Sequence, residues 1–116
     1  MVQIISEKNI NEFIYKHSEF AESLKAWMSI VKQCTWEKPQ DIVEKFGAKA
    51  VDILPNSNRR VVIDIKGNKI RIIGQYKFYT NLENVKKSRF YINWIGTHAE
   101  YNRLCKNNLQ YTVNIY

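Results

Sequence analysis

The residue types that can carry chemistry gather in the second half of the chain. His98 stands where a strand-like segment meets a helix-like one, and Arg60 and Arg71 lie in two neighbouring strand-like segments. An imidazole exchanges protons near neutral pH, and a guanidinium grips a phosphate through its planar fork. These side chains on a cationic surface predict cleavage of RNA without a metal ion.

In such cleavage the 2′-hydroxyl group of the RNA attacks the adjacent phosphate, so the substrate supplies its own nucleophile. The protein must then provide a proton acceptor, a proton donor and cations that stabilise the charge on the phosphorane. His98 is a candidate for proton transfer, and Arg60 or Arg71 is a candidate for holding the phosphate. Further candidates for either role are Lys66, Lys69, Tyr91 and Tyr101.

Some of these candidates also have purely structural explanations, and both kinds of explanation stay open at this point. Asp64 and Arg71 can form a cross-strand salt bridge and nothing more. His98 can be merely the first residue of a capped helix. Tyr91 can be a half-exposed aromatic residue of a strand.

Other reaction classes lack the residues they need. The only carboxylates of the basic half are Asp64, Glu83 and Glu100, far apart in sequence, whereas metal-dependent nucleases need clustered carboxylates. Cys34 and Cys105 stand alone, without the spacing of a zinc site. No P-loop, GxGxxG or GxSxG motif is present. We expect neither a metal ion nor a cofactor.

Net charge separates the two halves of the chain. Residues 1–58 carry seven Lys and Arg against eight Asp and Glu, a net charge of −1, whereas residues 59–116 carry eleven against three, a net charge of +8. A lysine surface that only keeps a protein in solution would be spread evenly. The asymmetry favours RNA, DNA or an acidic protein segment as the partner of the second half.

The length of 116 residues fits one domain, spanning residues 1–116. No apolar run approaches the ~20 residues of a membrane span. The start of the chain, Met1–Ile5, lacks the basic and apolar regions of an export signal. We therefore expect a single cytoplasmic domain without a membrane partner.

The first half predicts a short strand followed by three helices. Val2–Ile5 is apolar and suits an edge strand. Ser6 and Ser18 are candidate N-caps of two amphipathic helices, and a third helix, Gln40–Phe46, has a proline before it and a glycine after it. The positions at helical spacing are Ile10, Phe13, Ile14 and His17 in the first helix, and Phe20, Leu24, Trp27, Met28 and Val31 in the second.

From Arg59 the period of the apolar residues changes to two. Gly67-Asn68 predicts a two-residue hairpin turn, of type II′ because glycine comes first. This turn sets the register, which pairs Lys66 with Lys69, Asp64 with Arg71, Val62 with Ile73, and Arg60 with Gln75. One face then carries the polar residues Arg60, Asp64, Lys66, Lys69, Arg71 and Gln75, and the other face lays Ile63, Ile65, Ile70 and Ile72 against the helices.

A third strand, Arg89–Ile95, is expected after a polar and basic loop at Thr80–Ser88. Thr97 and Glu100 fit a capping box that starts a helix running through Leu104. The tail, residues 110–116, alternates weakly and suggests a further strand. Alternation in the third strand places Phe90, Ile92 and Trp94 inward and Arg89, Tyr91 and Asn93 outward.

The segments Asn58–Ile73 and Trp94–Tyr101, the latter reading Trp-Ile-Gly-Thr-His-Ala-Glu-Tyr, resemble the HigB toxin family of the RelE/ParE superfamily. Trp36–Pro39 and Phe46-Gly47 also look like that family, and the similarity spans residues 5–105 in a single order. The family-like positions are Arg60, Lys66, Gly67, Asn68, Lys69, Arg71, Gly96, Thr97, His98 and Tyr101. The connection 81–89 and the tail beyond Lys106 depart from the family.

The resemblance implies a RelE-like α+β fold, in which N-terminal helices pack on one face of a small antiparallel sheet, a short C-terminal helix follows, and the other sheet face binds RNA. It also implies a ribosome-dependent endoribonuclease that cleaves translated mRNA and is neutralised by a HigA-type helix-turn-helix antitoxin. The candidate catalytic residues are Arg71, His98, Lys69 and Tyr101, and the candidate RNA-binding residues are Arg60, Lys66, Asn68, Arg89, Tyr91 and Asn93.

Two other functions remain open on the sequence. A ParE-like chain is also basic, and it acts on gyrase without cleaving RNA. A non-catalytic RNA-binding module would use Tyr76, Tyr79 and Tyr91 for stacking. Mapping of RNA ends distinguishes the three functions, and a small helix-turn-helix protein encoded beside this one would favour the toxin.

Overall fold

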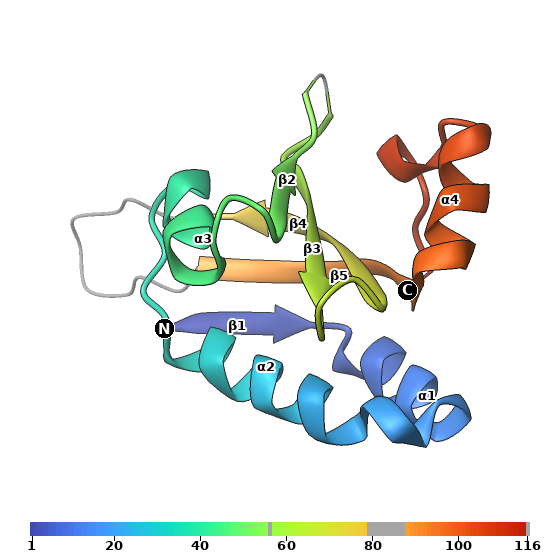
Figure 1. Ribbon diagram of the computed structural model, residues 1–116. Helices are drawn as coiled ribbons and strands as arrows, with labels where there is room; N and C mark the ends of the chain where they lie inside the picture. The colour runs from blue at the N-terminus through green and yellow to red at the C-terminus, as the bar shows by residue number, and fades with distance from the viewer. Residues whose placement is uncertain (56, 79–87, 116) are drawn as a thin grey trace.

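A computed structural model describes residues 1–55, 57–78 and 88–115 (Figure 1). The expected α+β fold class is confirmed. Its elements, in chain order, are β1 (Val2–Ile5), α1 (Glu7–Lys16), the 3₁₀ turn η1 (Ser18–Phe20), α2 (Ala21–Gln33), α3 (Pro39–Phe46), β2 (Val51–Ile53), β3 (Arg60–Ile65), β4 (Ile70–Lys77), β5 (Ser88–Thr97), α4 (His98–Lys106) and the 3₁₀ turn η2 (Leu109–Tyr111).

The strands form one sheet in the order β1-β5-β4-β3-β2. Neighbours from β5 to β2 are antiparallel, whereas β1 pairs parallel with β5, from Val2 beside Ser88 to Ile5 beside Tyr91. The prediction that Val2–Ile5 forms an edge strand is confirmed, but its parallel pairing makes the sheet mixed. β2 was not expected, because three residues are too few to show a period of two.

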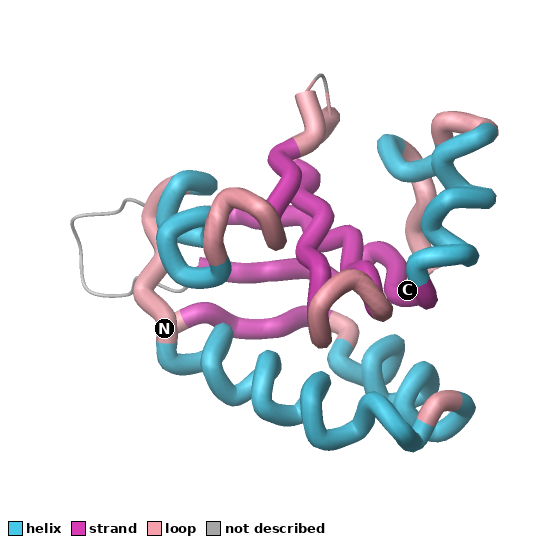
Figure 2. Tube along the Cα trace, viewed as in Figure 1, coloured by secondary structure: helices cyan, strands magenta, loops and turns pink. Residues whose placement is uncertain are grey.

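Helices α1 and α2 form a layer on one face of the sheet (Figure 2). Most of their predicted apolar positions are buried there, among them Ile10, Leu24 and Val31 with no exposed surface. Ile14, His17 and Phe20 are only half-buried. Trp27 of α2 meets the ring of Phe90 on β5 edge-on, at 6.1 Å between centroids. None of the described helices combines the length and the apolar composition that a membrane span requires.

The helix ends agree only in part with the expected caps. Thr97 and Glu100 form the predicted capping box of α4, with the Thr97 amide donating to Glu100 Oε1 at 2.8 Å and the Glu100 amide donating to Thr97 Oγ1 at 3.3 Å. α3 begins at Pro39 and ends before Gly47, as expected. Ser6 precedes α1 but its side chain makes no capping hydrogen bond. Ser18 opens the turn η1 instead of capping α2, which begins at Ala21.

The register of the β3–β4 hairpin is confirmed. Asp64 pairs with Arg71, and the pairs Val62 with Ile73 and Arg60 with Gln75 also match the prediction. The strand ladder ends at Ile65 with Ile70. Lys66 and Lys69 lie opposite each other in the turn beyond it, as predicted, and the Lys69 amide donates to the Lys66 carbonyl oxygen at 3.4 Å. The turn spans residues 66–69, because Lys66 as well as Gly67 adopts a positive φ, 56° and 67° respectively.

A β-bulge in β5 reverses the predicted direction of Trp94, and the predicted exposure of Asn93 is also wrong. Trp94 pairs with Ile73 and Ile92 pairs with Gly74, which leaves Asn93 as the extra residue. Trp94 therefore packs on the face away from α1 and α2, and Asn93 is completely buried. The period of two that placed Trp94 inward and Asn93 outward fails at the bulge, because one extra residue shifts the alternation.

The residues after α4, which we call the C-terminal segment (107–115), cover part of this second face. Tyr111 and Val113 pack on a small apolar cluster that contains Leu54, Val62 and Ile73. The segment contains η2 and is not the strand that residues 110–116 suggested. Of the expected basic loop at Thr80–Ser88, Ser88 begins β5, and residues 80–87 lie outside the described residues.

A buried arginine ties the C-terminal segment to the sheet. Arg60 on β3 is 6% exposed, and its Nη1 donates to the carbonyl oxygens of Gln110, at 3.3 Å, and Val113, at 2.7 Å. The amide of Ile115 donates to the carbonyl oxygen of Asn93 at 3.0 Å. The position of this segment therefore depends on charge-assisted hydrogen bonds from Arg60, which lies 50 residues before Gln110 in the sequence.

Replacing Arg60 by alanine is expected to lower the free energy of unfolding by about 2–3 kcal/mol, because hydrogen bonds from a charged donor are lost in a buried place. Urea unfolding measures this change, and amide exchange of Ile115 reports the loosened segment. The exposed Arg103→Ala serves as control, with a change within about 0.5 kcal/mol. Equal stability of the two variants would show that Arg60 does not anchor the segment.

Candidate functional site

The predicted catalytic residues meet where the β3–β4 turn touches the start of α4. The amide of His98 donates to the carbonyl oxygen of Lys69 at 3.0 Å, and Arg71 pairs with Gly96 across the β4–β5 ladder. We call this place the hairpin–helix corner; it comprises Asp64, Asn68, Lys69, Arg71, His98 and Tyr101. The four catalytic candidates come from the turn, β4 and α4, yet the sheet brings them to one end of the molecule (Figure 1).

Arg71 is the centre of the corner. Its Nε donates to the carboxylate of Asp64, and its Nη2 donates to the side-chain oxygen of Asn68. Its Cζ lies 5.0 Å from the centre of the Tyr101 ring. The cross-strand salt bridge that the register predicted is therefore present, and two further contacts hold the same guanidinium. No described residue accepts a hydrogen bond from Nη1, so this nitrogen remains available to a ligand.

His98 occupies the first position of α4 and is half-buried. Its Nε2 lies 3.3 Å from the side-chain amide nitrogen of Asn102, one helical turn later. Its Nδ1 is buried and has no partner among the described residues. If the Asn102 amide donates to Nε2, the ring carries its proton on Nδ1. Asn102 was not predicted as part of the site, although its spacing of four residues from His98 on a helix is the signal that reveals it.

Tyr101 lies between Arg71 and Trp94. Its ring centroid is 6.1 Å from that of Trp94. Burial raises the pKa of the Tyr101 hydroxyl above its usual value; a hydrogen bond with the Cys105 side chain raises it further, and the positive charge of Arg71 offsets part of the increase. The phenol therefore stays protonated at neutral pH, which makes it unsuited to accept a proton.

The rim of the corner is basic and accessible. Lys66, Asn68 and Lys69 are exposed in the β3–β4 turn. Lys66 Nζ lies 6.0 Å from the centre of the Phe20 ring, toward the helix layer. Cations that surround the held guanidinium favour an anionic ligand at this end of the sheet.

The remaining RNA-binding candidates lie elsewhere. Arg89 and Tyr91 are half-buried on β5, paired with Lys77 and Gln75 of β4, nearer the opposite end of that strand from Gly96. Arg60 is buried beneath the C-terminal segment and Asn93 is buried at the bulge, so the predicted exposure of these two candidates is wrong. For Asn93 the cause is the bulge, and for Arg60 it is the tail, which no local pattern could place.

The tyrosines proposed for base stacking do not form one surface. Tyr76 stacks on Phe78 at 5.0 Å and packs against the core on the helix side of the sheet. Tyr91 belongs to the other face by its pairing with Gln75. Tyr79 lies outside the described residues. The described tyrosines thus give little support to a stacking platform.

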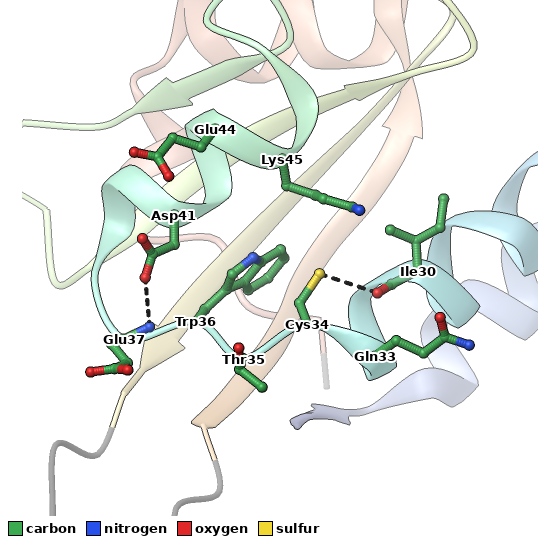
Figure 3. A pocket seen from close by; sticks show the side chains of 9 residues that line it. All are labelled: Ile30, Gln33, Cys34, Thr35, Trp36, Glu37, Asp41, Glu44 and Lys45. Atoms are coloured by element: carbon green, nitrogen blue, oxygen red, sulfur yellow. Dashed lines mark hydrogen bonds between the residues drawn. The ribbon is translucent and has the colours of Figure 1, made fainter.

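A cavity of about 620 Å³ opens away from the corner, between the end of α2 and α3 (Figure 3). Its lining includes Cys34, whose thiol donates to the carbonyl oxygen of Ile30 at 3.2 Å. Burial raises the pKa of this thiol, with Lys45 offsetting part of the effect. The thiol stays protonated, and none of the predicted site residues lines the cavity. Among the described residues, no group of three or more His, Cys, Asp or Glu is placed to hold a metal ion.

The raised pKa of Tyr101 predicts a loss of stability in alkaline solution. A tyrosine in the unfolded chain ionises near pH 10, whereas Tyr101 in the folded protein stays neutral to a higher pH. Below pH 10 the phenol is neutral in both states. Above pH 10 ionisation favours the unfolded state, so the free energy of unfolding declines as the pH rises. The free energy of unfolding should therefore fall more steeply between pH 10 and 11.5 in the wild type than in Tyr101→Phe. Tyr15→Phe, at a site that is 90% exposed, should follow the wild type; parallel curves for all three proteins would contradict the buried state of Tyr101.

Comparison with known proteins leads to the same family that the segments forming the corner resemble. Residues 20–104 match the model of the HigB toxin family, described as the RelE-like toxic component of a toxin-antitoxin system. The chain is also similar to the mRNA interferase HigB of Escherichia coli O6:H1 (strain CFT073), with 28% identity over 105 residues that cover 90% of this chain and 93% of the relative. The matched range includes the whole hairpin–helix corner and stops before the C-terminal segment. The chain belongs to the HigB family of RelE-like toxins.

Proposed function

We propose that this chain is a ribosome-dependent endoribonuclease that cleaves translated mRNA and thereby arrests growth. The observation that carries the proposal is the Arg71 guanidinium, which is held at the same hairpin–helix corner as His98 and has one nitrogen without a described acceptor. The chain's membership of a toxin family supports the same conclusion. The similarity to an mRNA interferase supports the same reaction. A HigA-type helix-turn-helix antitoxin would neutralise the activity, and the site of action would be the cytoplasm, where mRNA is translated.

In the proposed reaction the 2′-oxygen of the RNA forms a bond to phosphorus, and the bond from phosphorus to the 5′-oxygen of the next nucleotide breaks. The proton of the 2′-hydroxyl group passes to a base, and the departing 5′-oxygen takes up a proton. His98 exchanges one of these protons. Arg71 and Lys69 stabilise the negative charge that grows on the phosphorane. The reaction uses neither a metal ion nor a cofactor.

The proposed dependence on the ribosome follows from the small number of side chains at the corner that can transfer a proton. Among the residues of the corner, His98 alone carries an imidazole, the side chain that most often transfers protons in catalysis. A site with one such group gains most from a substrate whose 2′-oxygen, phosphorus and 5′-oxygen are already in line, because orientation removes a large part of the barrier. The ribosome holds mRNA and can provide that orientation.

The exposed Lys66 and Asn68 in the turn extend the proposed RNA surface from the corner, and Arg89 and Tyr91 extend it along β5. Arg60 and Asn93 take no part, because both side chains are buried. Phosphate contacts by these cations would make binding fall steeply with salt.

Expression of the chain without an antitoxin should arrest growth and truncate mRNAs within their coding regions. Sequencing of RNA ends, with the protein's accumulation verified on the same samples, measures both effects. Undiminished growth would contradict the toxin proposal. Gyrase-dependent DNA damage with intact mRNA would replace the nuclease with a ParE-like activity, and RNA binding without cleavage would indicate a non-catalytic module.

Substitution of Arg71 should slow cleavage on ribosomes by about 100-fold, because a charge-assisted contact that is strongest in the transition state is lost. Arg71→Lys tests geometry, since lysine keeps the charge but lacks the planar fork. His98→Ala should also cost about 100-fold if the imidazole transfers a proton.

Arg103→Ala, which removes an exposed cation of α4, is the matched control and should cleave within about threefold of the wild type. Thermal midpoints separate chemical effects from folding, since Arg71→Ala leaves Asp64 without its partner. Cleavage at the wild-type rate by both Arg71→Lys and His98→Ala would refute the placement of the site.

A further inference from the structure

We infer that Tyr101 is a positioning residue, whose ring face acts together with the Asp64 carboxylate to fix the Arg71 guanidinium for the phosphate, and that the Tyr101 hydroxyl transfers no proton. This inference rests on the proposed function for the identity of the ligand. The contacts that carry it are those of the free protein and do not depend on the reaction.

Three contacts restrain Arg71 from three directions. Asp64 accepts from Nε, Asn68 accepts from Nη2, and Cζ lies over the ring of Tyr101 at 5.0 Å from its centre. Only 12% of the Arg71 side chain is exposed, whereas 21% of the Asp64 side chain is. These contacts restrict a long side chain with several rotatable bonds, and they leave Nη1, the nitrogen without a described partner, for a ligand.

Fixing the guanidinium in advance matters because a phosphorane is best stabilised by donors that need not reorient during the reaction. A free arginine would lose its rotational freedom when it binds the phosphate, and that loss would weaken the contact. The negative charge of Asp64 lowers the attraction between Arg71 and an anion, but the orientation it imposes favours the transition state over loosely bound RNA.

The contact that Tyr101 makes with Arg71 is through its ring. The nearby Cys105 side chain, one helical turn later on α4, acts on the hydroxyl. Burial and this interaction raise the pKa of the phenol away from neutrality, which makes it a poor proton acceptor and a poor proton donor. The ring, in contrast, presents the electron-rich face that attracts a guanidinium, and Trp94 supports it from the other side of the cluster.

Paired substitutions separate the ring from the hydroxyl. Tyr101→Leu removes the aromatic face and should lower kcat on ribosomes by about tenfold or more, with KM little changed. Tyr101→Phe restores the ring alone and should rescue cleavage to within about threefold of the wild type, with an unaltered pH profile. Equal losses in Tyr101→Phe and Tyr101→Leu, with one limb of the pH profile missing in both, would overturn the inference.

A second measurement uses the free protein and needs no cleavage. Hydrogen exchange at Arg71 Nε, followed by NMR, should be slow in the wild type and in Tyr101→Phe, and about tenfold faster in Tyr101→Leu and in Asp64→Asn. Arg103 Nε serves as the internal reference, and thermal midpoints confirm that each variant is folded. Equal exchange at Arg71 in all four proteins would overturn the inference even if RNA is cleaved. The expected pattern in a protein that cleaves no RNA would uphold the positioning and defeat the proposed function.

Discussion

Burial of the isoleucine face of the β3–β4 hairpin is the constraint on which the site depends. Ile63, Ile70 and Ile72 have no exposed surface, and a slip of the hairpin by one residue would turn all of them toward solvent. The same register that buries them puts Asp64 opposite Arg71 on the other face. The hydrophobic effect thus determines where the charged pair stands, and the pair need not contribute to the choice of fold.

The second face of the sheet shows how a local irregularity changes what a site can contain. The bulge at Asn93 turns Trp94 toward α4, where it supports Tyr101 beneath Arg71. The same bulge buries the amide of Asn93, whose Nδ2 and Oδ1 have no partner among the described residues. The C-terminal segment then covers the middle of the face and is held by Arg60. The turn residues of the hairpin–helix corner, in contrast, are basic and exposed.

The sequence was most informative where residues interact with near neighbours. The hairpin register, the capping box of Thr97 and Glu100, and the third helix all follow from short-range rules, and they suffice to place Arg71 and His98 together. The roles of Arg60 and Asn93 could not be predicted. Arg60 is buried by a segment 50 residues later in sequence. Asn93 is buried at a bulge, which no pattern of residue types in β5 indicates. Contacts at a distance and insertions in a ladder have no local signal.

The chemical identity of the RNA ends tests the central claim most directly. Purified protein would be added to ribosomes stalled on a defined mRNA, and both ends of each product would be analysed. Attack by the 2′-hydroxyl group produces a 5′-hydroxyl end and a 2′,3′-cyclic phosphate, or the 3′-phosphate formed from it, within the ribosome-bound segment; the proposed function predicts these ends and their loss in Arg71→Lys. Products with 5′-phosphate ends, or intact mRNA in the presence of folded protein, would contradict it.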